Sequence, residues 1–385
     1  MTAAERLARL RLIRTPHVGP VSWHQLIQRF GSGEAALDAL PQLVLRGGSG
    51  KPRIASAALV EQEMERVAML GARYLFSDDR DYPPLLRAVA DAPPVLIMRG
   101  DAAILHRPAV AIVGARNASA VACRFARQLA ADLAGQGIAI VSGLARGVDT
   151  AAHVGGLGGA TVGVIASGID VAFPPENAEL QDRIAAGHLL LAEQPPGTEP
   201  LARHFPSRNR IIAGAAHATV VIEAAPRSGS LITARRAADY GREVMAVPGS
   251  PLDPRAQGCN QLIRDGATLI QNAADVIEAI GPIDPRMVRD PAARDTERRD
   301  TGGRQMGGDA RAPFPPSPRG IEPRDESAGE GERRAIAELL GPTPVTIDEL
   351  VRQSGRSAAT VQLIVLELEL AGRIERHAGA KISLV

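Results

Sequence analysis

Aromatic residues, cysteines and lysines are scarce in this chain. Aromatic side chains make up only 3% of its 385 residues, so the cores must be filled mainly by Ala, Val, Leu and Ile, and few rings are available to stack on bases. The two cysteines, Cys123 and Cys259, lack the close pairing that zinc sites and redox motifs need, which indicates small core residues in a reducing cytoplasm. We therefore expect no metal and no cofactor.

A surplus of charge of one sign is also missing. The chain has 44 Lys and Arg residues against 43 Asp and Glu residues, a net charge of +1, so any contact with nucleic acid must come from local clusters of positive charge. Lys51 and Lys381 are the only lysines. All other positively charged side chains of this group are arginines, which bind phosphate in bidentate geometry. A GC-rich genome alone would also favour arginine codons.

Long apolar runs are absent as well. The longest uncharged run, residues 150–169, contains six glycines and has the texture of a strand with its loops, so we expect no membrane span. Charged residues interrupt residues 1–12, which excludes a signal peptide there.

The length of the chain exceeds the usual size of one hydrophobic core, so we expect several domains. Residues 1–72 show apolar residues at helical spacing with a break at Gly19-Pro20, which predicts a small helical domain. Such a glycine turn is typical of sterile-alpha-motif-like (SAM-like) and helix-hairpin-helix modules, whose backbone N–H groups face phosphate. A helical packing module without that role fits the pattern equally well.

Residues 73–281 alternate short β-branched runs with helical stretches, which indicates parallel βαβ units. The predicted strands are residues 95–98, 110–113, 138–141, 161–165, 189–192, 219–222 and 243–247. Continuous apolar runs, rather than strict alternation, indicate strands covered by helices on both faces. We therefore predict an α/β fold with a Rossmann-like, doubly wound, mostly parallel sheet.

The last hundred residues divide into a linker and a small domain. Residues 282–330 are rich in Pro, Gly, Arg and Asp, which predicts a disordered linker. Residues 331–385 show three helical patterns and a hairpin, which predicts a winged helix. Its predicted recognition helix, residues 358–371, carries Glu367 and Glu369 and no basic residue. Phosphate repulsion disfavours groove binding, so we favour a protein-contacting or regulatory role for this domain.

Four segments of the α/β domain combine small residues, hydroxyls and arginine next to a predicted strand end or helix start. They contain Gly114, Arg116 and Ser119; Ser142, Gly143, Arg146 and Gly147; Arg208, Asn209 and Arg210, placed just before a predicted helix; and Ser228, Gly229 and Ser230. Helix starts attract phosphate, and ligands of a doubly wound sheet bind at the carboxyl ends of its strands. Arg116 and Arg146 should therefore share one crevice, and the four segments together indicate a nucleic-acid strand.

Enzyme motifs are not found at these strand ends. Arg116 and Ser119 stand where a dinucleotide fingerprint needs glycines, so a nicotinamide enzyme is disfavoured. His153 is interpreted as a satisfied helix histidine rather than a catalytic base. No Ser/His/Asp order, carboxylate pair or metal-ligand spacing rises above chance.

In content and order, residues 114–119, 142–149, 205–212, 228–234 and 247–250 resemble the DNA-processing protein A (DprA, also called Smf) family. The resemblance extends from about residue 82 to residue 274, and the helical front and winged-helix tail look like family extensions. It implies a Rossmann-like protein without catalytic residues that binds single-stranded DNA and forms a homodimer. It also implies that the protein protects incoming DNA and loads a RecA-type recombinase during natural transformation.

Carried over by position, the resemblance implies phosphate contacts from Gly114, Arg116, Ser119, Arg146, Arg208 and Arg210. Phe173 is implied as a base-stacking platform, although it could equally be a core residue. Two departures stand out: Ala115 replaces the usual serine of a Gly-Ser-Arg turn, and residues 169–177 lack a lysine often found there, which predicts lower affinity.

The alternative is a nucleoside-monophosphate phosphoribohydrolase of the lysine-decarboxylase-like group, whose Rossmann fold also ends a strand in a glycine-rich phosphate loop. The loop of that group has a glycine run followed by a glutamate for acid–base chemistry. Residues 227–234 lack both, and Glu223 comes before the loop. Release of free base from AMP or CMP would favour the enzyme.

Overall fold

The computed structural model describes residues 1–48, 53–281, 328–377 and 379–385. Within these ranges the chain forms two compact units: residues 1–25, 32–34 and 53–281 make up the first, and residues 26–31, 35–48 and 328–385 the second. Residues 282–327 of the predicted linker lie outside the described residues. Among the helices of the described residues, none is both long enough and apolar enough to cross a bilayer.

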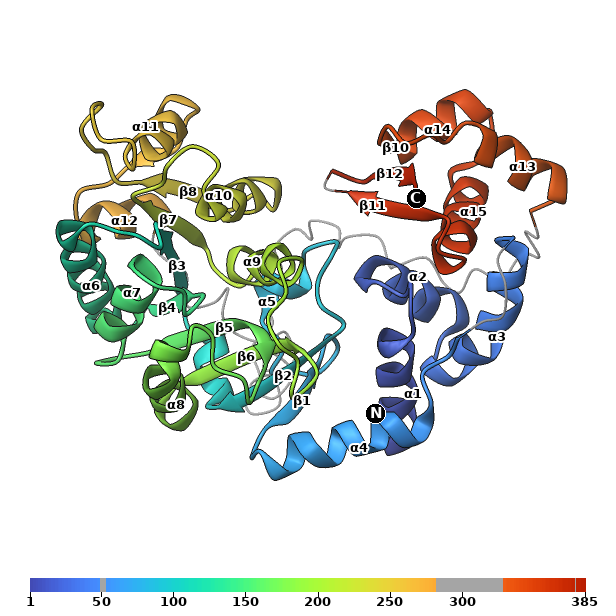
Figure 1. The fold of residues 1–385 in the computed structure, drawn as a ribbon, viewed down its shortest axis with the longest axis horizontal. Coiled ribbons are helices and arrows are strands. Elements are labelled where there is room, and N and C mark those ends of the chain that lie inside the picture. The colour runs from blue at the N-terminus through green and yellow to red at the C-terminus, as the bar shows by residue number, and fades with distance from the viewer. Residues whose placement is uncertain (49–52, 282–327, 378) are drawn as a thin grey trace, which may run out of the picture. The chain divides into compact units, whose positions relative to one another are not determined.

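A nine-stranded sheet forms the centre of the first unit, in the order β1-β2-β6-β5-β4-β3-β7-β8-β9 (Figure 1). Its strands are β1 (Arg73–Phe76), β2 (Val95–Gly100), β3 (Ala109–Gly114), β4 (Ala139–Ser142), β5 (Thr161–Gly168), β6 (Leu189–Gln194), β7 (Ala218–Ile222), β8 (Glu243–Ala246) and β9 (Thr268–Leu269). β2 runs antiparallel to the other strands of this sheet, which are all parallel to one another. The predicted Rossmann-like, mostly parallel fold is therefore confirmed, and all predicted strands are present.

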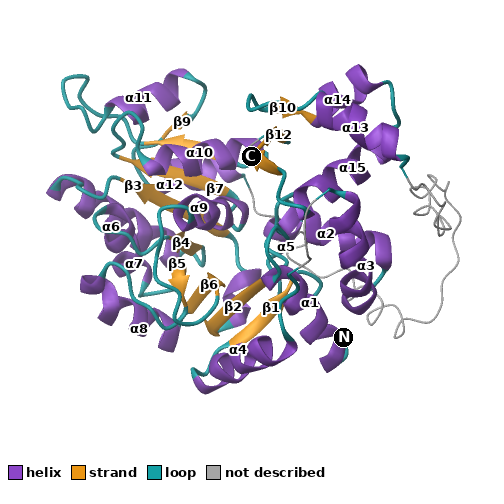
Figure 2. Cartoon of the chain, turned by 45° about the vertical axis from the view of Figure 1, so that its right-hand side comes forward, coloured by secondary structure: helices purple, strands orange, loops and turns teal. Residues whose placement is uncertain are grey.

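Helices cover both faces of this sheet (Figure 2). One core cluster joins the sheet to α6 (Ala120–Gly135), α7 (Val148–Gly156) and α12 (Ala273–Ile280). Another joins it to α5 (Pro84–Arg87), α9 (His204–Gly214), α10 (Gly229–Asp239) and α11 (Gln257–Arg264). In β3, Val110 and Ile112 belong to the first cluster, and Ala111 and Val113 to the second. Burial on both faces explains why the strands read as continuous apolar runs.

The chain reverses its direction across the sheet at β3. From β3 it continues to β4, β5 and β6 on one side, and then returns to β7 on the other side of β3. The switch point of this doubly wound sheet therefore lies between β3 and β7, where a crevice for a ligand is expected. Gly114 is required here, because a Cβ atom at this position would lie 1.9 Å from the carbonyl oxygen of Ile222.

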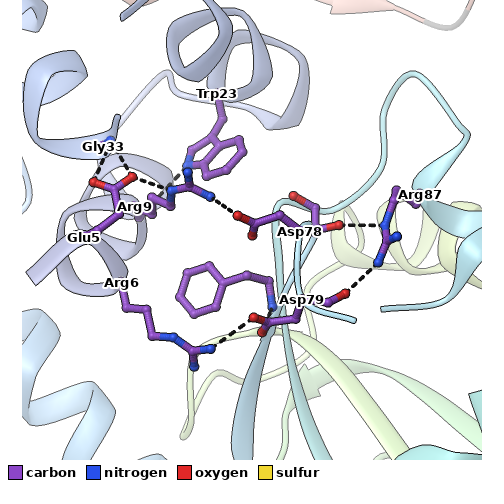
Figure 3. A network of polar contacts seen from close by, with 10 residues as sticks. Glu5, Arg6, Arg9, Trp23, Gly33, Asp78, Asp79 and Arg87 are labelled. Carbon is purple, nitrogen blue, oxygen red and sulfur yellow. Dashed lines mark hydrogen bonds and ion pairs between the residues drawn. The ribbon is translucent and has the colours of Figure 1, made fainter. Parts of the chain in front are cut away.

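Helices α1 (Ala3–Arg14) and α4 (Ala57–Met69) belong to the first unit and pack beside β1 and β2 together with α8 (Ala178–Gly187). Two ion pairs fasten α1 to the turn after β1 (Figure 3). Arg6 donates to Asp79 at 3.0 Å, and Arg9 donates to Asp78 at 2.7 Å. Glu5, one turn before Arg9, accepts a hydrogen bond from its Nε at 2.5 Å. The arginines of α1 are therefore engaged in holding this helix in place.

Helices α2 (Pro20–Phe30) and α3 (Gly33–Arg46) follow α1. The C-terminal part of the second unit consists of α13 (Glu330–Glu338), β10 (Val345–Thr346), α14 (Ile347–Ser354), α15 (Ala358–Leu370), β11 (Ile374–His377) and β12 (Lys381–Leu384). Its three strands form one antiparallel sheet in the order β10-β12-β11. Three helices followed by this hairpin are the predicted winged helix.

The two glutamates of α15 do not act as exposed charges. Glu367 is fully buried and accepts from Arg333 at 2.6 Å, while Glu369 accepts from Arg376 at 2.7 Å. Repulsion of phosphate by these two residues, which the sequence analysis assumed, was therefore wrong, because both carboxylates are neutralised inside the domain. Groove binding by α15 is still disfavoured, because this helix carries no basic residue.

Candidate nucleic-acid interface

Two adjoining cavities open at the carboxyl ends of the parallel strands. The first has a volume of about 380 Å³ and the second of about 790 Å³. Both are lined by Arg116, Asn117, Ala145, Phe205 and Arg208. The first adds Gly143, Ala166, Arg146, Phe173, Pro174, Pro175 and Pro200. Side chains from four separate strand ends or helix starts therefore meet at one edge of the sheet, and Arg116 and Arg146 share a cavity as expected.

The ring of Phe205 lies close to two of these arginines. The guanidinium carbon of Arg116 is 4.9 Å from the centre of the Phe205 ring, and that of Arg208 is 6.0 Å from the same centre. Phe173 meets the ring edge to face at 5.9 Å. Cations over an aromatic face are attracted by its quadrupole, so the ring holds both charges near the cavity. Phe205 was not predicted as a site residue, although an aromatic residue at the start of an arginine motif was an available signal in a chain with few aromatics.

Arg208 is a buried cation at the wall of both cavities. Only 6% of the residue is exposed, and Nη1 lies 3.8 Å from the carboxylate of Asp149, which also accepts the N–H of Gly143 at 3.2 Å. Burial raises the pKa of Asp149, and the charge of Arg208 opposes that rise. Within the described part of the chain, Nε of Arg208 has no hydrogen-bond partner. A buried donor left unpaired is costly, so the protein holds this guanidinium group in place at an energetic cost.

Gly143 makes room for this arginine. A Cβ atom at Gly143 would lie 1.2 Å from Nη1 of Arg208, which is impossible without displacing the guanidinium group. The glycine, which follows the last residue of β4, is therefore explained by the close approach of a side chain from α9.

Arg146 is exposed, and its charge is partly compensated. Its Nε donates a hydrogen bond to the carboxylate of Glu176, and this bond raises the pKa of Arg146 and lowers that of Glu176. Glu176 belongs to the stretch in which the family resemblance had suggested a lysine. Glu176 therefore forms an ion pair with Arg146, where a lysine would have added a second cation to the cavity.

The turn before α10 lines the second cavity. Ser228 caps α10, and its hydroxyl lies 2.8 Å from that of Ser230. The side-chain amide of Asn209 donates to the carbonyl oxygen of Gly229 at 3.3 Å, which connects α9 to this turn. The second cavity is also lined by Gly114 and by two arginines that the sequence analysis missed, Arg227 and Arg255.

Arg210 does not line either cavity. The residue is 6% exposed, and its guanidinium group donates to the carbonyl oxygen of Asp91 and to the carboxylate of Glu193. The expectation that Arg208 and Arg210 precede a helix was wrong, because both lie inside α9. Residues two positions apart on a helix point in different directions, so only Arg208 reaches the cavities.

Three further predicted residues lie behind the cavity walls. The buried hydroxyl of Ser142 donates to the carbonyl oxygen of Ile112 at 2.6 Å. Gly147 precedes α7 with φ +75°, where a Cβ atom would lie 2.4 Å from the carbonyl oxygen of Ala115. Ser119 caps α6, but its N–H and hydroxyl both donate to Glu223. These residues fix the loops that carry the arginines.

His153 is fully buried, and Nδ1 lies 2.7 Å from the hydroxyl of Thr161. Burial lowers its pKa to about 3, so the ring is neutral near neutral pH. The interpretation of His153 as a satisfied structural histidine is therefore confirmed.

A doubly wound sheet with arginine-bearing loops at its switch point, joined to a helical module and a winged helix, defines a Rossmann-like multidomain protein with a candidate site for a polyanion. Family comparisons agree with this. Residues 73–281 match the family described as DNA recombination-mediator protein A, residues 3–65 match a DprA-like N-terminal HHH domain, and residues 320–380 match a DprA winged helix domain. The chain belongs to the DprA/Smf family.

Individual relatives support the assignment. The DNA processing protein DprA of Streptococcus pneumoniae is 46% identical over 201 residues, covering 52% of this chain and 71% of the relative. Protein Smf of Synechocystis is 32% identical over 383 residues, covering 94% and 95% of the two chains.

Similar solved structures include those of two DprA proteins. The X-ray structure of DprA from Streptococcus pneumoniae has a TM-score of 0.61 at 35% identity and covers 71% of this chain and 97% of that one. DprA from Helicobacter pylori, whose structure concerns its single-stranded DNA binding mode, has a TM-score of 0.50 at 29% identity and covers 54% and 95%.

Proposed function

We propose that this protein binds single-stranded DNA in the two adjoining cavities and acts in the cytoplasm by binding rather than by catalysis. The observation that carries the proposal is the convergence of Arg116, Arg146 and Arg208 on one cavity that also contains Phe173 and Phe205. Guanidinium groups bind phosphate, and aromatic rings stack on bases. Both components of an unpaired strand therefore find partners within one site.

An unpaired strand fits this site better than a duplex does. The first cavity has a volume of about 380 Å³, and besides its arginines it is lined by two phenylalanines and three prolines. An apolar pocket of this kind takes a base whose faces are free, whereas the faces of a paired base are covered by its neighbours. A duplex would offer the same arginines only its backbone.

The residues proposed to contact the strand are eleven of those that line the cavities. They are Gly114, Arg116, Gly143, Arg146, Phe173, Phe205, Arg208, Asn209, Ser228, Gly229 and Ser230. Arg210, Ser142, Gly147 and Ser119 are proposed to position these residues, because their own polar groups or backbone are engaged within the protein.

Fluorescence anisotropy with labelled single-stranded and double-stranded oligonucleotides of equal length tests the proposal. The single strand should bind more tightly, and Arg116→Ala should weaken its binding and reduce the slope of log K against log salt by about 0.7, the effect of one lost phosphate contact. Arg127→Ala, which removes an exposed arginine from the middle of α6, is the control. A salt slope that Arg116→Ala leaves unchanged would argue against phosphate contact at Arg116.

The cavities are poor in groups for acid–base chemistry. Asp149 is the one carboxylic acid among their lining residues, and it is buried against Arg208. The phosphoribohydrolase alternative needs an accessible glutamate after the phosphate loop. Incubation of the protein with AMP or CMP should therefore release no free base, and release would favour the enzyme.

Protection of incoming DNA and loading of a RecA-type recombinase during transformation complete the proposal, with a homodimer as the acting form. These steps are supported by membership of the DprA/Smf family. Sedimentation equilibrium should give the mass of two chains. Assembly of a RecA-type recombinase on strands coated with single-strand binding protein should depend on the wild-type protein and fail with Arg116→Ala.

A further inference from the structure

We propose that Glu223 is a built-in anion that occupies the start of α6, excludes a DNA phosphate from it and leaves the phosphates to the arginines of the cavities. The inference rests on the proposed function, since it concerns how the same site selects its phosphate positions. The sequence pattern pointed to the opposite arrangement, with Ser119 and the start of α6 as one of the phosphate contacts.

The carboxylate of Glu223 uses both of its oxygens at this helix start. The N–H of Ser119 donates to Oε2 at 2.8 Å, and the hydroxyl of Ser119 donates to Oε1 at 2.6 Å. The same hydroxyl oxygen accepts the N–H of Ala122 at 3.1 Å. A negative charge is favourable at a helix start, and a phosphate would need these same donors. The carboxylate therefore stands where the phosphate would go.

The backbone delivers Glu223 to this place. It directly follows β7, and its φ of +49° lies in the left-handed region that glutamate rarely adopts. The preceding carbonyl group, that of Ile222, accepts the N–H of Ala115 at 3.3 Å. Two sets of hydrogen bonds therefore connect the end of β7 to the turn after β3. The backbone bond at Ala115 comes just before Arg116 in the chain, and the bonds from Ser119 to the carboxylate come after it. Glu223 is therefore a positioning residue for the Arg116 turn.

The charge of Glu223 also reaches the second cavity. Arg255 lines that cavity, and its pKa is raised by Asp253 and further by the carboxylate of Glu223. A strand in this cavity would therefore meet the negative charge of Glu223 as well as the positive charge of Arg255. The negative charge repels a phosphate from the start of α6 and limits how tightly a strand binds.

Glu223→Gln separates charge from shape, because a glutamine amide can accept the N–H of Ser119 and donate to its hydroxyl oxygen. The variant should bind single-stranded DNA roughly two-fold more tightly at low salt, because removing a like charge weakens the repulsion of nearby phosphates. Glu243→Gln is the matched control. Glu243 is exposed at the amino end of β8, whereas the cavities lie at the carboxyl ends of the parallel strands. Equal affinities for Glu223→Gln and wild type, or weaker binding by Glu223→Gln, would overturn the proposal.

Inorganic phosphate provides a test that does not involve DNA. In Glu223→Ala the donors of Ser119 are free, so phosphate should shift the amide signal of Ser119 in nitrogen–proton spectra of the variant and leave the wild type unchanged. A shift of equal size in both proteins, or in neither, would overturn the exclusion. If the wild type failed to bind single-stranded DNA, the proposed function would fall while this experiment still decided the role of Glu223.

Discussion

Replacing Arg208 by methionine would leave the carboxylate of Asp149 buried without its cation. Both residues are 6% exposed, and 3.8 Å separates Nη1 from Oδ2. Removing one partner of a buried ion pair typically costs about 3–5 kcal/mol. The cost in this protein should lie near about 3 kcal/mol, because the pair is long and Asp149 keeps its hydrogen bonds from the N–H groups of Gly143 and Ala145. The melting temperature of the α/β domain should fall by roughly 6–12 °C.

The loss should depend on pH in a defined direction. Burial already raises the pKa of Asp149 above its ordinary value of 3.8, and Arg208 restrains that rise. Without Arg208 the folded-state pKa rises further above the unfolded value, so the folded variant holds its proton more strongly than the unfolded chain does. The stabilisation of the folded variant that comes from this higher pKa is complete at pH values below the pKa of Asp149 in the unfolded chain. It is lost as pH rises through the pKa of Asp149 in the folded protein. Arg208→Met should therefore be nearer to wild type in acid than in alkali.

Thermal unfolding followed by circular dichroism at about pH 5 and about pH 8 measures both effects. The double variant Arg208→Met/Asp149→Asn removes the buried charge and should recover most of the loss. A single variant melting within about 2 °C of wild type at the higher pH, or a double variant no more stable than the single one, would refute the reasoning.

Two further predictions concern DNA affinity, measured by anisotropy. Glu176→Gln frees the guanidinium group of Arg146 from its exposed ion pair, so single-stranded DNA should bind roughly three-fold more tightly; unchanged affinity would show that Arg146 takes no part. Gly143→Ala would place a Cβ atom 1.2 Å from Nη1 of Arg208 and should weaken binding, whereas Gly158→Ala, with nothing within 4 Å, should not. Equal behaviour of these two variants would contradict the assigned role of Gly143.

The sheet was predictable because its strands are buried on both faces. Val110 to Val113 of β3 contribute alternately to the cores on the two sides, so the strand reads as an unbroken apolar run. The edge strands β1 and β9 escaped prediction because they are short. β1 begins with the exposed Arg73, and β9 has only two residues, too few for any period to appear.

Only those site residues that lie in loops directly after predicted strands could be placed from the sequence. Arg116 and Arg146 lie just past β3 and β4, so topology alone brings them to one edge of the sheet. The roles of Arg210 and Ser119 depend on side-chain direction within α9 and on a partner 104 residues away in the chain. The side-chain direction and the distant partner are both determined by tertiary packing, so neither can be predicted from a local sequence pattern.

The ring of Phe205 has a consequence for the speed of recognition. Burial lowers the pKa of Arg208, and repulsion by Arg116 lowers it further, yet both guanidinium groups are held close to the ring of Phe205 before any strand arrives. An incoming polyanion relieves this repulsion without having to order the side chains first, so little conformational entropy is lost on capture. Encounter should therefore be fast and strongly dependent on ionic strength, while the lifetime of the complex should be governed by how well the bases fit the pocket.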